Sequence, residues 1–209
     1  EAEFASARAA VGDGISMRLG VELGDAFWDF ARTERIMAAS PKLDFVIGSV
    51  HMLSRAYETW DLSVYAPEDE HAAKRAIADY LESAYAMAKW GKFSVLGHLT
   101  LPLRYFREKQ GLDVSFDPFG GEVEDIFRVL IQNGCGIEVN TNRGHTPLPD
   151  EKWLRLYRSM GGEIITLGSD AHSPAFTGCA IREGQALLRE CGFGRFCTFD
   201  GGAPVWHEL

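Results

Sequence analysis

Five side chains of the kinds that bind divalent metals follow short apolar runs along this sequence. They are Glu22, His51, His98, Asp170 and His172. Each stands at or just beyond the end of a run that has the composition of a buried strand. A lone histidine beside an apolar run is usually a hydrogen-bonded core residue, but three of the six histidines at strand ends, together with two acids, favour metal binding. Carboxylates and imidazoles without thiolates suit zinc, manganese or iron.

A site of this kind can activate water and hold the attacking and leaving oxygens of a phosphoester. Arg104 and Arg143, in loops after these runs, are candidates to grip a phosphate through paired N–H groups. A surface ion pair is the alternative explanation for each arginine. His145, close behind Arg143, is a candidate proton donor to the leaving alkoxide, and an exposed loop histidine is its alternative.

These residues need a scaffold that brings distant strand ends together. The predicted strands cover residues 18–24, 44–51, 92–98, 135–140, 161–172 and 196–199. The predicted helices cover residues 1–11, 26–39, 67–91, 120–133, 149–160 and 178–191. A loop is predicted over 52–66, and the tail over 201–209 is either a packed segment or a loose end. Alternation of uninterrupted apolar strands with helices predicts an α/β fold, either a barrel or an open parallel sheet. Side chains at the carboxyl ends of such strands converge.

Composition limits the class of protein. The chain of 209 residues is 46% hydrophobic, which fits one domain over residues 1–209. The net charge of −9 disfavours nucleic acid as a partner. No run is long enough to span a membrane and no secretory signal is apparent, so we expect a cytoplasmic protein without a membrane partner. The four cysteines lack CxxC spacing, which favours reduced core thiols.

Four segments carry a family resemblance. DFVIGSVH at 44–51, VLGHLTLPLRYF at 95–106, IEVNTNRG at 137–144 and ITLGSDAH at 165–172, in this order and spacing, resemble the PHP superfamily of metal-dependent phosphoesterases. Within that superfamily they resemble the histidinol-phosphate phosphatases of histidine biosynthesis. The resemblance extends from about Leu19 to Phe199.

The resemblance implies a distorted seven-stranded β/α barrel of TIM-like type with a metal cluster of up to three ions, and hydrolysis of L-histidinol phosphate to histidinol and phosphate. By position, Glu22 would bridge two metals, while His51, His98, Asp170 and His172 would be terminal ligands. Arg104 and Arg143 would bind the substrate phosphate. Trp60 and Asp61 would border the substrate, and Asn140 and Ser173 are either phosphate contacts or plain turn residues.

One departure from the family pattern stands out. Members of the family begin with a strand that carries an HxH pair, followed by a strand with another histidine, whereas this sequence contains no HxH. About 60 residues of the family pattern, two βα units, are therefore absent at the N-terminus. The sequence leaves open a fragment, a segment supplied by another polypeptide, or a protein that has lost part of its site. The five retained ligands could still hold two ions, and we expect an oligomer or a rearranged edge where the barrel is open.

Three functions follow from these observations. The first is a histidinol-phosphate phosphatase. The second is a related phosphoesterase acting on another small phosphate, because pocket shape and not the ligand set selects the alcohol. The third is a non-catalytic remnant that binds metal.

Overall fold

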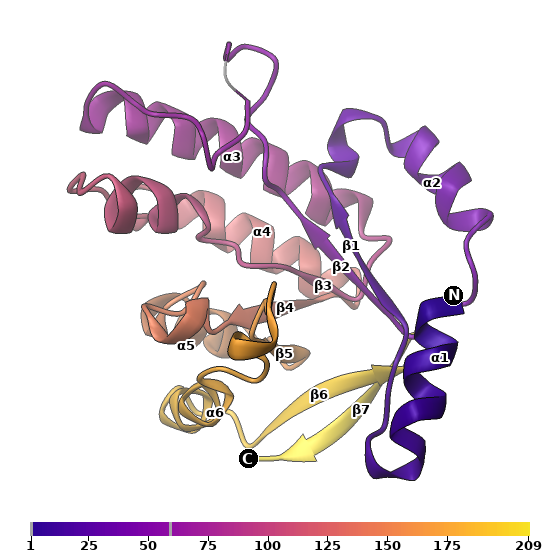
Figure 1. Ribbon diagram of the computed structural model, residues 1–209. Helices are drawn as coiled ribbons and strands as arrows, with labels where there is room; N and C mark the ends of the chain where they lie inside the picture. The colour runs from indigo at the N-terminus through magenta and orange to yellow at the C-terminus, as the bar shows by residue number, and fades with distance from the viewer. Residues whose placement is uncertain (1, 59) are drawn as a thin grey trace.

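Five parallel strands form the central sheet of the computed structural model, which describes residues 2–58 and 60–209. The strands lie side by side in the order in which they occur in the chain. They are β1 (Gly20–Gly24), β2 (Phe45–Ser49), β3 (Val95–Leu96), β4 (Gly136–Asn140) and β5 (Ile165–Gly168). The predicted α/β class and its first five strands are therefore confirmed (Figure 1). Glu1 and Thr59, which belong to the predicted first helix and the predicted 52–66 loop, lie outside the described residues.

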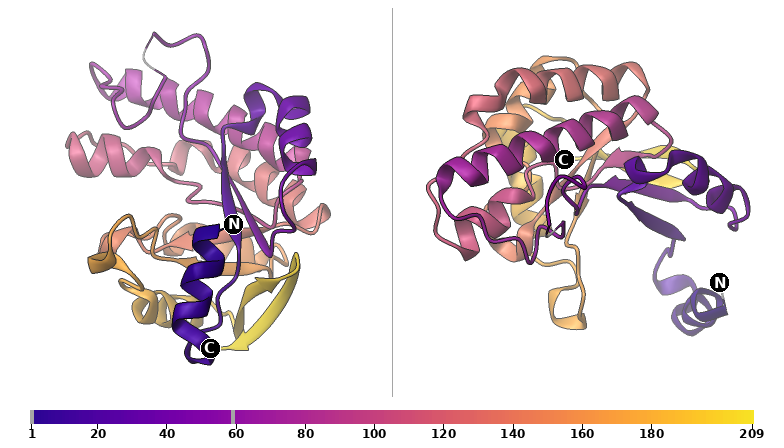
Figure 2. Two further views of the ribbon diagram at one scale, coloured as in Figure 1. Left: turned by 45° about the vertical axis from the view of Figure 1, so that its right-hand side comes forward. Right: turned by 90° about the horizontal axis from the view of Figure 1, so that it is seen from above.

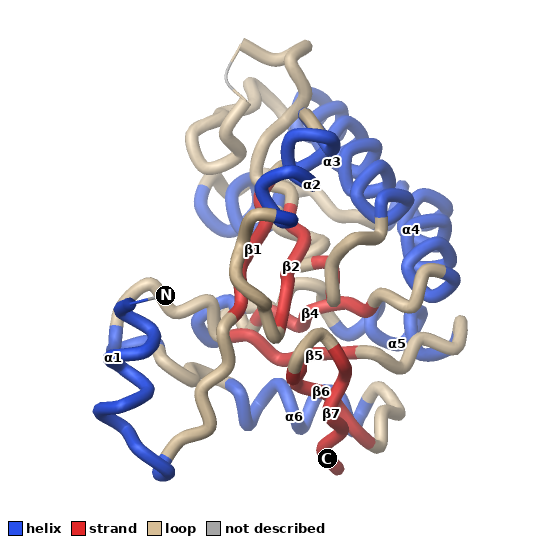
Figure 3. The backbone as a smooth tube through the Cα atoms, turned by 90° about the vertical axis from the view of Figure 1, so that its right-hand side faces the viewer, coloured by secondary structure: helices blue, strands red, loops and turns tan. Residues whose placement is uncertain are grey.

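Helices cover one face of this sheet. They are α2 (Phe30–Ala38), α3 (Glu70–Trp90), α4 (Gly120–Gln132), α5 (Glu151–Ser159) and α6 (Ile181–Glu190). Figure 3 shows them outside the strands, and the main hydrophobic core fills the space between the two layers. No helix in the part of the chain that the structure describes is both long and apolar enough to cross a membrane.

Helix α3 illustrates why the sequence folds as it does. The Asp69 side chain accepts the Ala72 N–H at 2.7 Å and so caps the first turn. Gly91 ends the helix in the left-handed conformation, with φ of 61°, which glycine adopts without a steric penalty. The apolar side of the helix is buried, from Ala72 to Ala88.

The predicted helix over 26–39 is interrupted. A 3-10 turn, Ala26–Trp28, comes first, and Asp29 then begins α2 by accepting the Arg32 N–H at 2.8 Å. Asp29 has the non-helical backbone angles of a capping residue, so the predicted single helix is divided into two elements at this position.

The C-terminal tail is a packed segment, one of the two alternatives that the sequence left open. Strands β6 (Arg195–Asp200) and β7 (Ala203–Glu208) form an antiparallel hairpin around Gly201 and Gly202, whose φ angles are 59° and 84°. Two positive φ angles in a two-residue loop are what a tight hairpin requires, and paired glycines supply them. The hairpin is visible in yellow at the bottom of Figure 1.

The hairpin packs on the sheet face opposite the helices. Cys197 and Phe199 form a small second core with Val95, and the Phe199 ring stacks on Phe45 with centroids 5.1 Å apart. The five-stranded sheet has β1 at one edge and β5 at the other. Beside the hairpin lies a mainly apolar cavity of about 330 Å³. The structure thus contains the parallel part of the expected barrel, with β1 paired on one side by β2.

The N-terminal helix, α1 (Ala2–Val11), has no buried residue. Figure 2 shows it standing apart from the rest of the chain.

Candidate functional site

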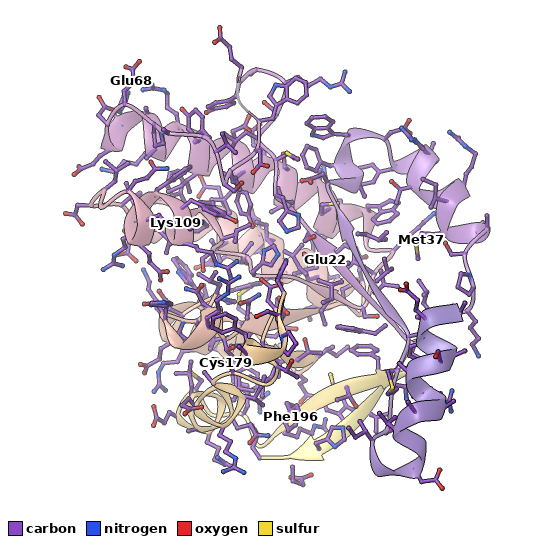
Figure 4. The ribbon with its side chains drawn as sticks, in the orientation of Figure 1. Glu22, Met37, Glu68, Lys109, Cys179 and Phe196 are labelled. Carbon is purple, nitrogen blue, oxygen red and sulfur yellow. The ribbon has the colours of Figure 1, made fainter. Side chains whose placement is uncertain are left out.

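Glu22, His51 and His98 converge at the carboxyl ends of β1, β2 and β3. The Glu22 Oε1 atom lies 3.2 Å from His51 Nε2 and 3.1 Å from His98 Nε2. One ligand atom from each residue lies within 4.8 Å of the others, and the two imidazole centroids are 4.9 Å apart. We call these three residues the ligand triad. The labelled Glu22 side chain lies near the middle of the molecule in Figure 4.

The sheet register explains the convergence. Glu22 pairs with Ile47 in β2, and Ile47 pairs with Val95 in β3, so neighbouring strands end at the same edge. His51 and His98 each follow the last paired residue of their strand by two positions, after Ser49 and Leu96. His98 has φ of 26°, an unusual value for a residue with a side chain, which turns the backbone out of β3 directly at the site.

The electrostatics of the ligand triad favour a carboxylate beside imidazoles. Hydrogen bonds from His51 and His98 hold the pKa of Glu22 far below its usual range. Burial disfavours the charged form of His51, but the hydrogen bond and charge of Glu22, with the charges of Asp25 and Asp170, outweigh it and raise the pKa of His51. The Glu22 carboxylate therefore stays charged beside the two imidazoles, and its negative charge favours a bound cation.

The donor set fits a divalent ion. Zinc bonds to nitrogen and oxygen are about 2.0–2.2 Å long, so two ligands of a tetrahedral ion lie roughly 3.3 Å apart. The Glu22 contacts to His51 and His98, at 3.2 and 3.1 Å, have this spacing. The three residues also combine carboxylate oxygen with imidazole nitrogen, a donor set that zinc and related metals accept.

Asp170 and His172 lie near the ligand triad but outside it. Asp170, just beyond β5, has φ of 48°, and its Oδ2 atom lies 3.4 Å from Arg104 Nη1. The His172 side chain is 72% exposed, compared with 4% for His98, and its Nδ1 atom lies 2.9 Å from the Asp170 carbonyl oxygen. The structure thus brings together three of the five predicted ligands and leaves two beside them.

Arg104 is held by three acceptors. Its Nε atom donates to Asn142 Oδ1 at 2.8 Å, Nη2 donates to Asn140 Oδ1 at 3.0 Å, and Nη1 donates to Asp170. Arg104 begins a π-helical segment, Arg104–Lys109. The guanidinium is therefore fixed in orientation where β4 and β5 end.

The predicted chemistry-bearing side chains share one cavity of about 380 Å³. Arg143, His145 and Asp170 line it together with the ligand triad. It also contains the other predicted site residues, Arg104 and His172, and the unpredicted Tyr105, Glu108, Lys109 and Asn142. Arg143 has φ of 54°, and its guanidinium carbon lies 4.9 Å from the centroid of the Phe176 ring. His145 is exposed at this wall.

Other residues singled out from the sequence make mainly structural contacts. Asn140 is buried, and its Oδ1 atom accepts both Arg104 Nη2 and the Asn142 N–H. Trp60 packs edge-on against Trp28 with centroids 5.2 Å apart, and Asp61 accepts the Ser63 N–H at 2.7 Å. Ser173 is exposed and precedes a short 3-10 turn, Pro174–Phe176.

Two acids behind the ligand triad, buried Glu138 and partly buried Asp25, were not predicted from the sequence. Glu138 lies within β4, accepts the His98 N–H at 3.2 Å, and has its pKa raised by burial. A Cβ atom on Gly168 would come within 2.0 Å of Glu138 Oε1, so glycine makes room for this carboxyl. Asp25 accepts the N–H groups of His51 and Met52. An acid inside an otherwise apolar run was the available clue for Glu138, because burying an unpaired carboxyl is costly.

This chain is similar in sequence to proteins named histidinol-phosphatases. Histidinol-phosphatase of Lactococcus lactis subsp. lactis (strain IL1403) is 26% identical over 198 residues, which cover 90% of this chain and 70% of that protein. The probable histidinol-phosphatase of Thermotoga maritima is 31% identical over 146 residues, covering 68% of this chain and 58% of the relative. This chain therefore spans about three fifths to seven tenths of the length of these two relatives.

Solved structures share the fold. A crystal structure of the Lactococcus lactis histidinol phosphate phosphatase complexed with zinc, L-histidinol and phosphate matches with a TM-score of 0.74 at 21% identity, over 98% of this chain and 77% of that one. The putative histidinol phosphatase of Listeria monocytogenes matches with a TM-score of 0.74 at 16% identity, over 87% of this chain and 73% of that one.

The family model described as PHP domain matches residues 2–142, which contain the whole ligand triad and Arg104. The resemblance inferred from four short segments is thereby confirmed, and the chain belongs to the PHP domain family.

Proposed function

We propose that this chain is a metal-dependent phosphomonoester hydrolase that acts on L-histidinol phosphate. The observation that carries the proposal is the cavity in which the ligand triad faces Arg104 and Arg143. The names of the relatives, histidinol-phosphatases, support the choice of substrate. The size of the cavity, about 380 Å³, suits a small organic phosphate.

Different residues of the cavity would bind the metal ion, bind the phosphate and donate a proton. The ligand triad would hold a divalent ion, which acts as a Lewis acid and activates water when bound. Arg104, oriented by Asn140 and Asn142, would bind the phosphoryl oxygens through a fixed pair of N–H groups. Arg143 would add positive charge from the facing loop, and His145 would protonate the leaving alkoxide.

Asp170 and His172 would complete the metal site. Both line the cavity with the ligand triad, and the charge of Asp170 acts on His51. Together with Glu22, these two residues would hold a second ion, in line with the expected two ions, or three where further ligands are supplied. A donor set of carboxylates and imidazoles supports zinc, manganese or iron as the proposed metal.

The substrate alcohol has groups that the cavity wall can recognise. Histidinol carries an ammonium group and an imidazole ring. The Glu108 carboxylate and the Tyr105 ring line the same cavity and could contact a cation and a flat ring. We infer that these two residues favour histidinol phosphate over phosphates of neutral alcohols.

The test is phosphate release from L-histidinol phosphate by the chain loaded with zinc or manganese, beside a panel of small phosphates. We expect turnover that Glu22→Gln abolishes, because the amide cannot replace the anionic ligand. Glu34→Gln is the matched control, since Glu34 lies on α2 and pairs with Lys92. Faster release from another phosphate would favour a related phosphoesterase of different specificity.

A non-catalytic metal-binding remnant is the second candidate. It is favoured by one observation, that Asp170 and His172 stand outside the ligand triad. Elemental analysis separates the two functions: bound metal without turnover of any phosphate would favour the remnant.

We also propose that the free edge of β1 pairs with another polypeptide strand in an oligomer. Within the residues that the structure describes, β1 pairs with β2 alone, and the mainly apolar cavity beside the hairpin is lined by Phe45 and Ile47 of β2. Light scattering on the purified chain tests this, and a monomer would contradict it.

The cytoplasmic location and the single-domain organisation over residues 1–209 remain predictions from the sequence.

A further inference from the structure

The turn after β1 ties two strand ends together through one residue. Asp25 has left-handed backbone angles, φ 56° and ψ 34°, and its N–H donates to the Ser49 carbonyl oxygen at 2.9 Å. Its Oδ1 atom accepts the N–H groups of His51 at 2.8 Å and Met52 at 2.9 Å. A single carboxylate thus fixes the backbone from which the His51 side chain projects.

The second carboxylate oxygen of Asp25 faces the ring of His51. Oδ2 lies 3.9 Å from His51 Nδ1, on the side of the ring away from Nε2. Nε2 lies 3.2 Å from Glu22 Oε1, so the imidazole stands between two carboxylates that come from positions three apart in the chain. The space beside Nδ1 is limited, because a Cβ atom on Gly24 would come within 3.2 Å of it.

Asp25 is shielded from water. Its side chain is 17% exposed, compared with 39% for Glu22. A carboxylate in this position costs free energy unless it is hydrogen-bonded, and two backbone N–H groups meet that need. The remaining oxygen is left facing the imidazole.

We propose that Asp25 is a positioning residue that fixes the backbone and the ring of His51 so that Nε2 is presented to a metal ion. This inference rests on the metal-dependent function proposed above. Carboxylates behind metal-binding histidines orient the ring and select the tautomer, and removing them typically lowers metal affinity about 10- to 100-fold. Asp25 acts through His51, since its own oxygens are turned away from the Nε2 side.

Two substitutions separate the backbone role from the ring role. Asp25→Ala removes both oxygens. Asp25→Asn keeps one oxygen to accept the His51 and Met52 N–H groups, but its amide nitrogen is a donor and cannot accept a proton from His51 Nδ1. Asp29→Asn is the matched control, because Asp29 also accepts a backbone N–H, from Arg32, at the start of α2.

The first measurement is hydrogen exchange of the His51 and Met52 amides in the metal-free chain. We expect both amides to lose protection in Asp25→Ala and to keep it in Asp25→Asn and Asp29→Asn. Unchanged protection in Asp25→Ala would overturn the backbone role.

The second measurement is zinc affinity by competition with a chelator. We expect about 10- to 100-fold weaker binding for Asp25→Ala and Asp25→Asn and no change for Asp29→Asn. Zinc binding by Asp25→Asn equal to that of the unmodified chain would overturn the ring role while leaving the proposed function intact. Failure of the unmodified chain to bind zinc would instead overturn the proposed function, and the metal-presenting role with it.

Discussion

Arg104 holds together more of the polar side chains around the cavity than any single acceptor does. It joins three acceptors from two different strand ends, Asn140 and Asn142 after β4 and Asp170 after β5. The planar guanidinium can satisfy several acceptors at once, whereas the ammonium of lysine is a single point. The same rigidity that organises these residues also aims the guanidinium at the cavity.

We predict that Arg104→Lys lowers both stability and activity. Loss of charge-assisted hydrogen bonds should lower the free energy of unfolding by about 1.5–3 kcal/mol, because buried acceptors lose their donor. Loss of the paired contact to phosphate should lower kcat/KM about 10- to 100-fold. Urea unfolding and phosphate release measure the two effects. Arg107→Lys, at an exposed position of the same π-helical segment, should change neither; equal effects in both variants would contradict a special role for Arg104.

At the scale of elements, the site depends on close contact between neighbouring strands. Glycines occupy points where strands and their covering residues approach too closely for a side chain. A Cβ atom on Gly136, at the start of β4, would come within 2.2 Å of the Ile164 carbonyl oxygen. This atom is backbone and cannot rotate away, so the register of β4 and β5 depends on the absence of a side chain.

We therefore predict that Gly136→Ala destabilises the chain by about 1–3 kcal/mol, the usual cost of overpacking. The measurement is the free energy of unfolding in urea. Gly121→Ala in α4 is the matched control, because an added Cβ meets no atom within 4 Å there. It should be neutral or stabilising by about 0.5–1 kcal/mol, since alanine favours helix more than glycine does. A stable Gly136→Ala variant would mean that β4 and β5 can shift apart.

Asp44 links the sheet to the C-terminal hairpin. Its side chain accepts the Gly201 N–H at 2.9 Å and the Leu19 N–H at 2.8 Å, and these bonds lower the pKa of Asp44. A lowered folded-state pKa means that the unfolded chain binds the proton more readily. The stabilisation is complete above the unfolded pKa of about 3.9 and is lost as pH falls through the folded value.

We predict that Asp44→Asn is less stable than the unmodified chain at pH 7 and that this difference shrinks as pH falls below about 4. Urea unfolding at pH 7, 5 and 3 checks it. Asp113→Asn is the control, since the structure records no hydrogen bond or ion pair to exposed Asp113 among the residues that it describes. A pH-independent difference for Asp44→Asn would show that the hydrogen bonds do not depend on its charge.

At the scale of the whole molecule, the exposure of the cysteines can be used to test whether the two hydrophobic cores stay closed to solvent. All four are free, as their spacing in the sequence predicts. Cys135, Cys191 and Cys197 are buried, and burial raises the pKa of each thiol, that of Cys197 to about 11. Cys179, in the segment before α6, is partly exposed.

We predict that one thiol, Cys179, reacts quickly with an alkylating reagent at pH 8, while the other three react only as the chain unfolds. The thiolate is the reactive form, and burial both suppresses it and blocks access. Mass spectrometry of the labelled chain over time gives the order of reaction. Cys179→Ser should abolish the fast phase, and a second fast thiol would indicate that one of the two cores opens.

The sequence by itself predicted the five strands of the parallel sheet and the edge of that sheet at which the site residues gather. Glu22, His51 and His98 each end an apolar run, and parallel neighbours end at the same edge of a sheet, so their meeting followed from local pattern. The strand predicted over 196–199 is confirmed as β6, whereas β7 and its pairing with β6 were not predicted, although Gly201 and Gly202 supply a tight turn between them. The roles of Asp25 and Glu138 were not predicted, because no periodic pattern in the sequence shows which backbone N–H group a single acid will contact.

Only the tertiary structure decided which ligands lie together. Asp170 and His172 also follow an apolar run, as the residues of the triad do. However, Asp170 has left-handed backbone geometry, and its carboxylate lies beside the Arg104 guanidinium rather than in the triad. Likewise, the structure shows that the carboxyls of Asp25 and buried Glu138, from neighbouring elements, accept the N–H groups of His51 and His98. Such contacts join residues 26 to 66 positions apart. They depend on the distances and angles between packed elements, which a local sequence pattern does not contain.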